Sequence, residues 1–155
     1  MTRLLGIDLG ERRIGCALAD DGPARALVTI RRGPSAAADA LAIGRLIEEH
    51  GVDEVVVGLP LDASGEEGTQ ARMTRAWAEA VTPLLGVPVA MRDERLSSHV
   101  AESRLGPMPR GRSGGPPTPT QRERYRARVD REAAAVILQD ELDARRASAA
   151  GRAGT

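Results

Sequence analysis

The sequence predicts an α/β fold built on a mixed five-stranded sheet with helices on both faces. Three short apolar runs near the N-terminus are separated by turn signals, which favours an antiparallel meander. Two later apolar runs contain almost no polar residue, which is typical of strands covered on both faces. Segments with helical spacing alternate with these two runs, so the chain is expected to cross over between parallel strands. A length of 155 residues suits a single domain with one core.

The expected order of elements is βββαβαβα. The strands are expected at residues 4–9, 14–19, 26–30, 52–58 and 87–91, and the helices at 36–50, 69–85, from about 97, and 129–145. Residues 1–146 are expected to form one domain. Within it, the Pro/Gly-rich segment 106–120 is expected to be a mobile loop, and the tail 147–155 is expected to be disordered.

The composition narrows the function classes. The formal net charge is zero, from 22 basic and 22 acidic residues, and every basic residue is an arginine. Aromatic residues make up 1% of the chain, so a protein that reads single strands by base stacking is not expected. One cysteine excludes an internal disulfide and a cysteine-based zinc site. No apolar run is long enough to span a membrane, and a cytoplasmic location is expected.

Asp8 is the first candidate for chemistry. In the strand 4–9 it shares a face with Gly6 and Gly10, and the strand should be central. Burying an unpaired carboxylate costs on the order of several kcal/mol, unless the group pairs with a cation or binds a metal. The flanking glycines would let a ligand approach closely. The alternative is an aspartate at a strand end that simply enters a turn.

Glu94 and Asp130 are the other two candidates. Glu94 follows a buried strand and precedes a helix, where α/β sheets gather their sites; alternatively, it is a solvated acid paired with Arg92 or Arg95. Asp130 heads the apolar stripe of the last predicted helix and should point toward the sheet. Alternatively, it stabilises the helix dipole from the first turn.

Three acids on a strand, a loop and a helix could together hold Mg²⁺ or Mn²⁺, which prefer oxygen ligands. In the expected strand order 3-2-1-4-5, Glu94 must reach across one strand to Asp8, about 10 Å away. Asp62, in the glycine-bounded loop 58–68, is the auxiliary acid that would replace it. The arginines that crowd the C-terminal third are expected to contact phosphates; they are Arg110, Arg112, Arg122, Arg124, Arg126 and Arg128.

Four segments resemble the YqgF family, whose members are described as Holliday junction resolvases or pre-16S rRNA nucleases. The segments are GIDLGERRIGCALAD, VVVGLPLDASGEEG, DERLSS and RVDREAAAVILQDEL, in the family's order. The resemblance implies an RNase H-like fold and a metal-dependent phosphodiesterase with Asp8, Glu94 and Asp130 as catalytic acids. The family usually has DERLTT, and Ser97 and Ser98 keep the hydroxyl groups.

The expected function is therefore a metal-dependent nuclease that processes the 5′ end of precursor 16S rRNA, as a monomer or homodimer. A Holliday junction resolvase acting on branched DNA and a non-catalytic processing factor are the alternatives. The neutral charge fits a DNA junction with many phosphate contacts less well. An actin-like ATPase lobe is disfavoured because such enzymes need two lobes around the nucleotide.

Overall fold

The computed structural model describes residues 2–153 and shows one five-stranded sheet in the order β3-β2-β1-β4-β5. Strand β1 is antiparallel to β2 and parallel to β4, and β4 is parallel to β5. The strands are β1 (Leu4–Leu9), β2 (Arg13–Ala19), β3 (Arg25–Arg31), β4 (Glu54–Pro60) and β5 (Val89–Glu94). The helices are α1 (Ala36–His50), α2 (Thr69–Leu85), α3 (Ser97–Leu105) and α4 (Pro119–Ala153), with a short 3-10 turn, η1 (Arg112–Gly114). The predicted mixed sheet is confirmed.

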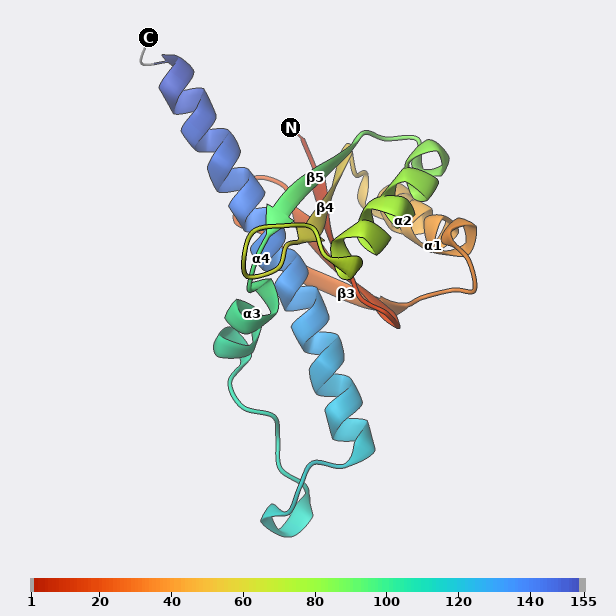
Figure 1. Cartoon of the computed structure of the whole chain (residues 1–155), viewed down its shortest axis with the longest axis vertical. Coiled ribbons are helices and arrows are strands. Elements are labelled where there is room, and N and C mark those ends of the chain that lie inside the picture. The colour runs from red at the N-terminus through yellow and green to blue at the C-terminus, as the bar shows by residue number, and fades with distance from the viewer. Residues whose placement is uncertain (1, 154–155) are drawn as a thin grey trace.

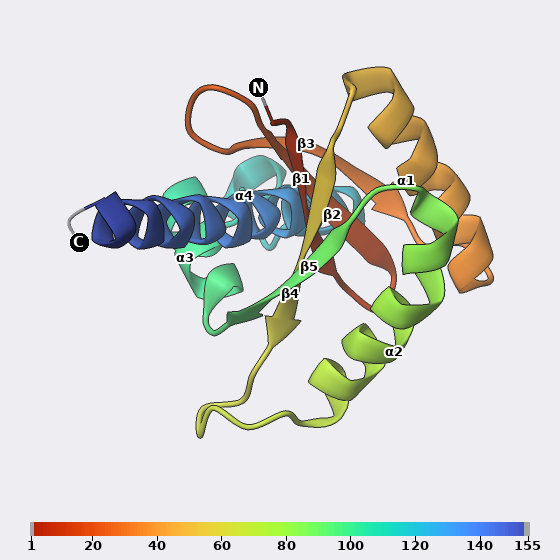
Figure 2. The same cartoon turned by 90° about the horizontal axis from the view of Figure 1, so that it is seen from above.

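Helices α1 and α2 cover one face of the sheet, and α4 crosses the other, as Figures 1 and 2 show. Under α1 and α2, buried Leu5 and Ile7 of β1 pack with Ile43, Trp77 and Val81. Side chains of a strand alternate between its faces, so Gly6 and Asp8 must face α4. Trp77 of α2 is buried in this core, whereas Met73 of the same helix is half exposed.

Small residues let α4 lie close to the sheet. A Cβ atom at Gly6 would lie 2.8 Å from Leu138 Cβ, and one at Gly15 would overlap the carbonyl oxygen of Asp130. Gly6 thus makes room for a helix and not, as the sequence suggested, for a ligand. The same helix is held over the sheet by Ala134 and Ile137, which are buried against it.

Helix α4 is longer than the sequence pattern predicts, because it begins at Pro119 and continues to Ala153. Its start carries a recognisable signal: the Gln121 backbone N–H donates to Thr118 Oγ1 (3.1 Å), and the Thr118 N–H donates to Gln121 Oε1 (2.8 Å). This reciprocal capping box with proline at the first position is a typical helix start. The other end runs through most of the segment expected to be disordered, where alanine and arginine favour a helix.

Both ends of α4 project beyond the sheet, and α3 packs beside its first half (Figure 1). The contact between the two helices is built on Ala101, Tyr125, Val129 and Ala133. Among residues 2–153, no helix is long and apolar enough to cross a membrane.

Candidate functional site

Asp8 lies in β1 opposite Gly15 of β2, on the sheet face that α4 crosses. Gly15 in turn touches the backbone of Asp130. This chain of contacts brings the carboxylates of Asp8 and Asp130 near one another. Burial, and to a smaller extent the negative charge of Asp130, together raise the pKa of Asp8 to about 7.

Asp130 is held by an arginine from the hairpin between β1 and β2. Arg13 Nε donates to Asp130 Oδ2 at 2.6 Å, and Arg13 Nη1 donates to Glu123 Oε1 at 3.1 Å. Burial raises the pKa of Asp130, while its bond to Arg13 opposes that rise. Asp130 lies about three turns into α4, so the helix dipole does not explain its presence.

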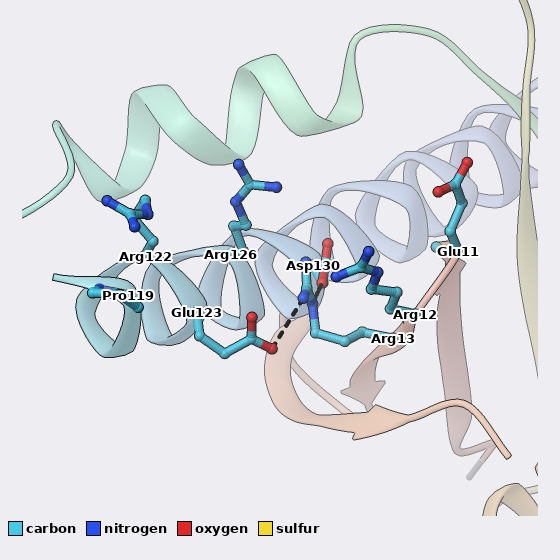
Figure 3. A pocket seen from close by; sticks show the side chains of 9 residues that line it. Glu11, Arg12, Arg13, Pro119, Arg122, Glu123, Arg126 and Asp130 are labelled. Carbon is cyan, nitrogen blue, oxygen red and sulfur yellow. Dashed lines mark hydrogen bonds and ion pairs between the residues drawn. The ribbon is translucent and has the colours of Figure 1, made fainter. Parts of the chain in front are cut away.

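A cavity of about 550 Å³ opens beside the ion pair of Arg13 and Asp130, between the β1–β2 hairpin and the first half of α4 (Figure 3). Its lining is strongly charged and consists of Gly10, Glu11, Arg12, Arg13, Pro119, Arg122, Glu123, Arg126 and Asp130. A neighbouring cavity of about 410 Å³ adds Arg31 and Arg32 from the end of β3. Several guanidinium groups therefore converge on a hollow with a carboxylate in its wall.

The structure separates the predicted arginines. Arg122 and Arg126 line the cavity with Asp130. Arg124 and Arg128 are exposed, and at 100° per residue they project from the opposite side of α4. Arg110 and Arg112 lie in the loop before α4, where Arg110 Nη1 donates to the carbonyl oxygen of Gly114.

Sequence reasoning missed the arginines at the start of β2 and the end of β3. Arg12, Arg13, Arg31 and Arg32 line the two cavities. The pair at 12–13 directly follows the strand that carries Asp8, in the segment GERRIG. A turn that begins two residues after a candidate ligand must stay near that ligand, and this was the available signal.

Glu94 ends β5 and lies on the same sheet face as Asp8, because Pro60 is its register partner and Gly58, two residues earlier, is covered by Ile137 of α4. Its surroundings are different from those of Asp8. Arg92 Nε is 3.5 Å from Glu94 Oε1. Burial, together with a hydrogen bond that the protonated Glu94 carboxyl donates to Asp140, raises the pKa of Glu94 to about 8. Asp140 follows Asp130 by ten residues, about 15 Å along the helix.

The pairing of Glu94 with Arg92 was one of the alternatives from the sequence, but the carboxylate is buried and not solvated, with 8% of the residue exposed.

The side chain of Asp62 points back toward the backbone of its own loop. Its Oδ1 accepts hydrogen bonds from the Ser64 backbone and hydroxyl and from the Glu66 N–H. The hydroxyl of Ser64 is the main cause that lowers the pKa of Asp62.

The described residues bring Asp8 and Asp130 together and place Glu94 and Asp62 elsewhere. Within residues 2–153, no group of three or more acidic, histidine or cysteine side chains is arranged to hold a metal ion. Two carboxylates still fit Mg²⁺, which keeps several waters and binds through one or two carboxylates plus substrate phosphates. The raised pKa of Asp8 fits the same role, because a carboxylate without a counter-charge favours a cation.

A family model described as "RuvX: Holliday junction resolvase" matches residues 2–144. The chain belongs to this family. A relative from Anaeromyxobacter sp. (strain Fw109-5), named "Putative pre-16S rRNA nuclease", is 48% identical over 147 residues, which is 94% of this chain and 99% of the relative. A relative of the same name from Chloroflexus aurantiacus (strain ATCC 29366 / DSM 635 / J-10-fl) is 42% identical and covers 94% of this chain and 89% of its own length. The resemblance drawn from the four motifs is confirmed.

A solved structure of T. thermophilus RuvC in complex with Holliday junction substrate is also similar. It superposes with a TM-score of 0.51 at 18% identity, and the match covers 93% of this chain and 96% of the RuvC chain. At this identity the likeness concerns the fold alone. The predicted RNase H-like fold of this RuvX-family chain is confirmed.

Proposed function

We propose that this RuvX-family protein is a divalent-metal-dependent phosphodiesterase that trims the 5′ end of precursor 16S rRNA. The observation that carries the proposal is the pair Asp8–Asp130 beside a cavity lined by arginines. The names of the relatives support the choice of RNA. The metal is proposed to be Mg²⁺ or Mn²⁺, and the protein to act in the cytoplasm as a monomer or homodimer.

Each part of the site has a proposed task. When bound, a divalent cation would supply polarisation of a phosphoryl oxygen and a more acidic water. Asp8 and Asp130 hold that cation, and Asp8 gives up its proton in doing so because burial otherwise keeps its pKa near 7. Arg122 and Arg126 place the phosphate backbone, since a guanidinium can donate two parallel hydrogen bonds to a phosphate.

Glu94 is proposed as the third acid and Asp62 as an auxiliary one. Glu94 is supported by its place at the end of a strand on the same sheet face as Asp8. To reach a cation held by Asp8, it must leave Arg92 and Asp140. The variant Glu94→Gln tests this: a ligand role lowers the cleavage rate as much as Asp8→Asn does, whereas a purely structural role leaves most of it.

The main test is Asp8→Asn, which keeps the shape of the side chain and removes its charge. We expect Mg²⁺-dependent cleavage of precursor 16S rRNA to fall by about three orders of magnitude or more, about 4 kcal/mol in the barrier. Circular dichroism should be unchanged. Asp21→Asn, an exposed aspartate in the β2–β3 turn, is the matched control and should cleave normally. Normal cleavage by Asp8→Asn would refute the proposal.

Cleavage of four-way DNA junctions is the second candidate function. It is favoured by the description of the family model and by the shared fold with a RuvC solved on a Holliday junction substrate. The purified protein should be given a four-way junction and a precursor 16S rRNA side by side, with Mg²⁺ or Mn²⁺. Preferential cutting of the junction would replace the rRNA proposal. Binding without cutting of either substrate would identify a non-catalytic processing factor.

A further inference from the structure

Arg13 occupies an unusual position for a positive charge, because it binds a candidate metal ligand directly. Its Nε lies 2.6 Å from Asp130 Oδ2 and its Nη1 lies 3.1 Å from Glu123 Oε1. The Arg13 side chain is only 18% exposed. Figure 3 shows it reaching from the hairpin to α4, at the edge of the arginine-lined cavity.

Two neighbouring groups have opposite electrostatic effects on the carboxylate of Asp130. Asp8 repels it from the sheet side, and Arg13 attracts it from the hairpin side. A divalent cation shared by Asp8 and Asp130 would bring a second positive group to the same carboxylate. Two cations that compete for one carboxylate weaken each other's hold, because each loses part of the charge that it neutralises.

We propose that Arg13 is an internal competitor of the metal: it neutralises Asp130 until a divalent cation arrives, and then turns to a phosphate oxygen of the substrate. This proposal rests on the proposed function and deepens it, since it couples metal binding to substrate binding. A phosphate site for Arg13 is close by, because Arg12, Arg122 and Arg126 line the same cavity as Arg13. Metal and phosphate would then bind cooperatively. A cation on Asp130 releases Arg13 for the phosphate, and a phosphate that binds Arg13 leaves Asp130 open to the cation.

The chemistry of arginine suits this exchange. The guanidinium stays charged at all relevant pH values, and its forked donors match a phosphate as well as a carboxylate. Glu123 is half exposed and lies on the cavity wall, so the bond from Arg13 to Glu123 can exchange with solvent or phosphate at small cost. Arg13 is the first residue of β2, directly after the turn, so its side chain can change partner without movement of the rest of the sheet.

A static role for Arg13 predicts the opposite sign. An arginine that orients Asp130 as a metal ligand supports metal binding, and its loss weakens that binding, often by 10–100-fold, an order-of-magnitude range for such supporting residues. An arginine that competes with the metal lowers metal affinity, and its loss strengthens binding. The direction of the change therefore decides between the two roles without any measurement of cleavage.

The experiment is a calorimetric titration of Mn²⁺ into wild type, Arg13→Gln and Arg12→Gln. Loss of a charge-assisted hydrogen bond to Asp130 is expected to lower the Kd of Arg13→Gln by about tenfold or more. Arg12 lines the same cavity without an ion pair to Asp130, so Arg12→Gln should change the Kd by about twofold, through long-range charge alone. An unchanged or weaker affinity of Arg13→Gln, or an equal gain in both variants, would overturn the proposal.

A second measurement uses the wild-type protein and does not depend on how the variant folds. The Arg13 Nε–Hε signal in a ¹⁵N spectrum, assigned with Arg13→Lys, reports the bond to Asp130. Saturating Mg²⁺ should shift this signal and speed its exchange with water, and inorganic phosphate should shift it further only when Mg²⁺ is present. A signal that stays fixed while Mg²⁺ binds would overturn the proposal. If the wild type binds no Mg²⁺ at all, the proposed function itself fails, and the two failures are thus distinguished.

Discussion

The two faces of the sheet are built from different kinds of residue. The face under α1 and α2 carries large apolar side chains such as Leu5, Ile7 and Ile43, which interdigitate with Trp77. The face under α4 carries glycine and alanine at many positions, with Gly6, Gly15 and Gly58 directly beneath the helix. The first face is a packed core, whereas the second lets a helix backbone lie against the strands.

One aspartate on each face, Asp39 fully buried and Asp8 partly buried, shows what the difference means. Asp39, in the first turn of α1, accepts hydrogen bonds from the Gly33 N–H (2.7 Å) and Trp77 Nε1 (3.0 Å), and Arg32 Nε lies 3.4 Å from its Oδ2. Among the residues that the structure describes, Asp8 has no such donor, and it faces Asp130 instead. A carboxylate that the fold satisfies is structural, and one that the fold leaves without a counter-charge is ready for a cation.

The largest effect on stability is expected from a methyl group on the glycine-lined face. In Gly15→Ala the new Cβ would overlap the backbone of Asp130, which cannot move without shifting α4. We expect a loss of about 3 kcal/mol, at the upper end of overpacking costs, and a weaker metal affinity because Asp8 and Asp130 separate. Gly44→Ala in α1 is the matched control: nothing lies within 4 Å, so a gain of about 0.5–1 kcal/mol is expected. Chemical denaturation of both variants measures the contrast.

The pH dependence of stability should reveal Asp8. Its folded pKa is raised to about 7, so its contribution to stability is fully present below its unfolded pKa and is lost as the pH rises through 7. Without metal, we expect the free energy of unfolding to fall on the order of 2 kcal/mol between pH 4 and 8, a value reduced for partial solvent exposure. Glu94, with its pKa near 8, contributes in the same direction.

Two variants separate these contributions. Asp8→Asn should abolish the part of this decline in unfolding free energy that comes from Asp8. Saturating Mg²⁺ should remove the same part in the wild type, because a cation stabilises the ionised carboxylate. Denaturation curves at several pH values provide the check. A wild-type stability that rises steadily from pH 4 to 8 would contradict the expected environment of Asp8.

The arginines of α4 offer a comparison within one helix. Replacing Arg122 and Arg126 by glutamine should weaken single-stranded RNA binding by about tenfold and reduce its salt slope by about 1.4, at about 0.7 per lost phosphate contact. The pair Arg124 and Arg128, on the opposite side of α4, should change both quantities much less. Fluorescence anisotropy at several salt concentrations distinguishes the pairs. Equal effects would mean that charge alone, and not the cavity, governs binding.

The smallest effect is expected on the packed face. Ile43 is fully buried between α1 and the sheet, so Ile43→Val should cost about 1 kcal/mol of stability. The rate of RNA cleavage should stay unchanged, because the site lies on the far side of the sheet. A clear change in that rate would show that the two faces are coupled.

The sequence by itself determined the sheet and most of its elements. Alternating and continuous apolar runs fix which segments pair, so the strand order and the helix 36–50 could be predicted closely. Asp8 could also be singled out from these apolar runs, since a charged residue interrupts the apolar pattern of a central strand. The start of α4 was also encoded, in Thr118 and Gln121, although hydrophobic periodicity alone missed it.

Only the tertiary structure decided which charged groups meet. Asp8 and Asp130 are neighbours because Gly15 admits the backbone of α4, while Glu94 meets Asp140 about 15 Å further along the same helix. Arg13 reaches Asp130 across a long separation in the sequence. Charge contacts of this kind leave no periodic signal, because they depend on where a helix crosses a sheet, and that is set by the volumes of side chains from distant segments. The acids were therefore visible in the sequence, and their partners were not.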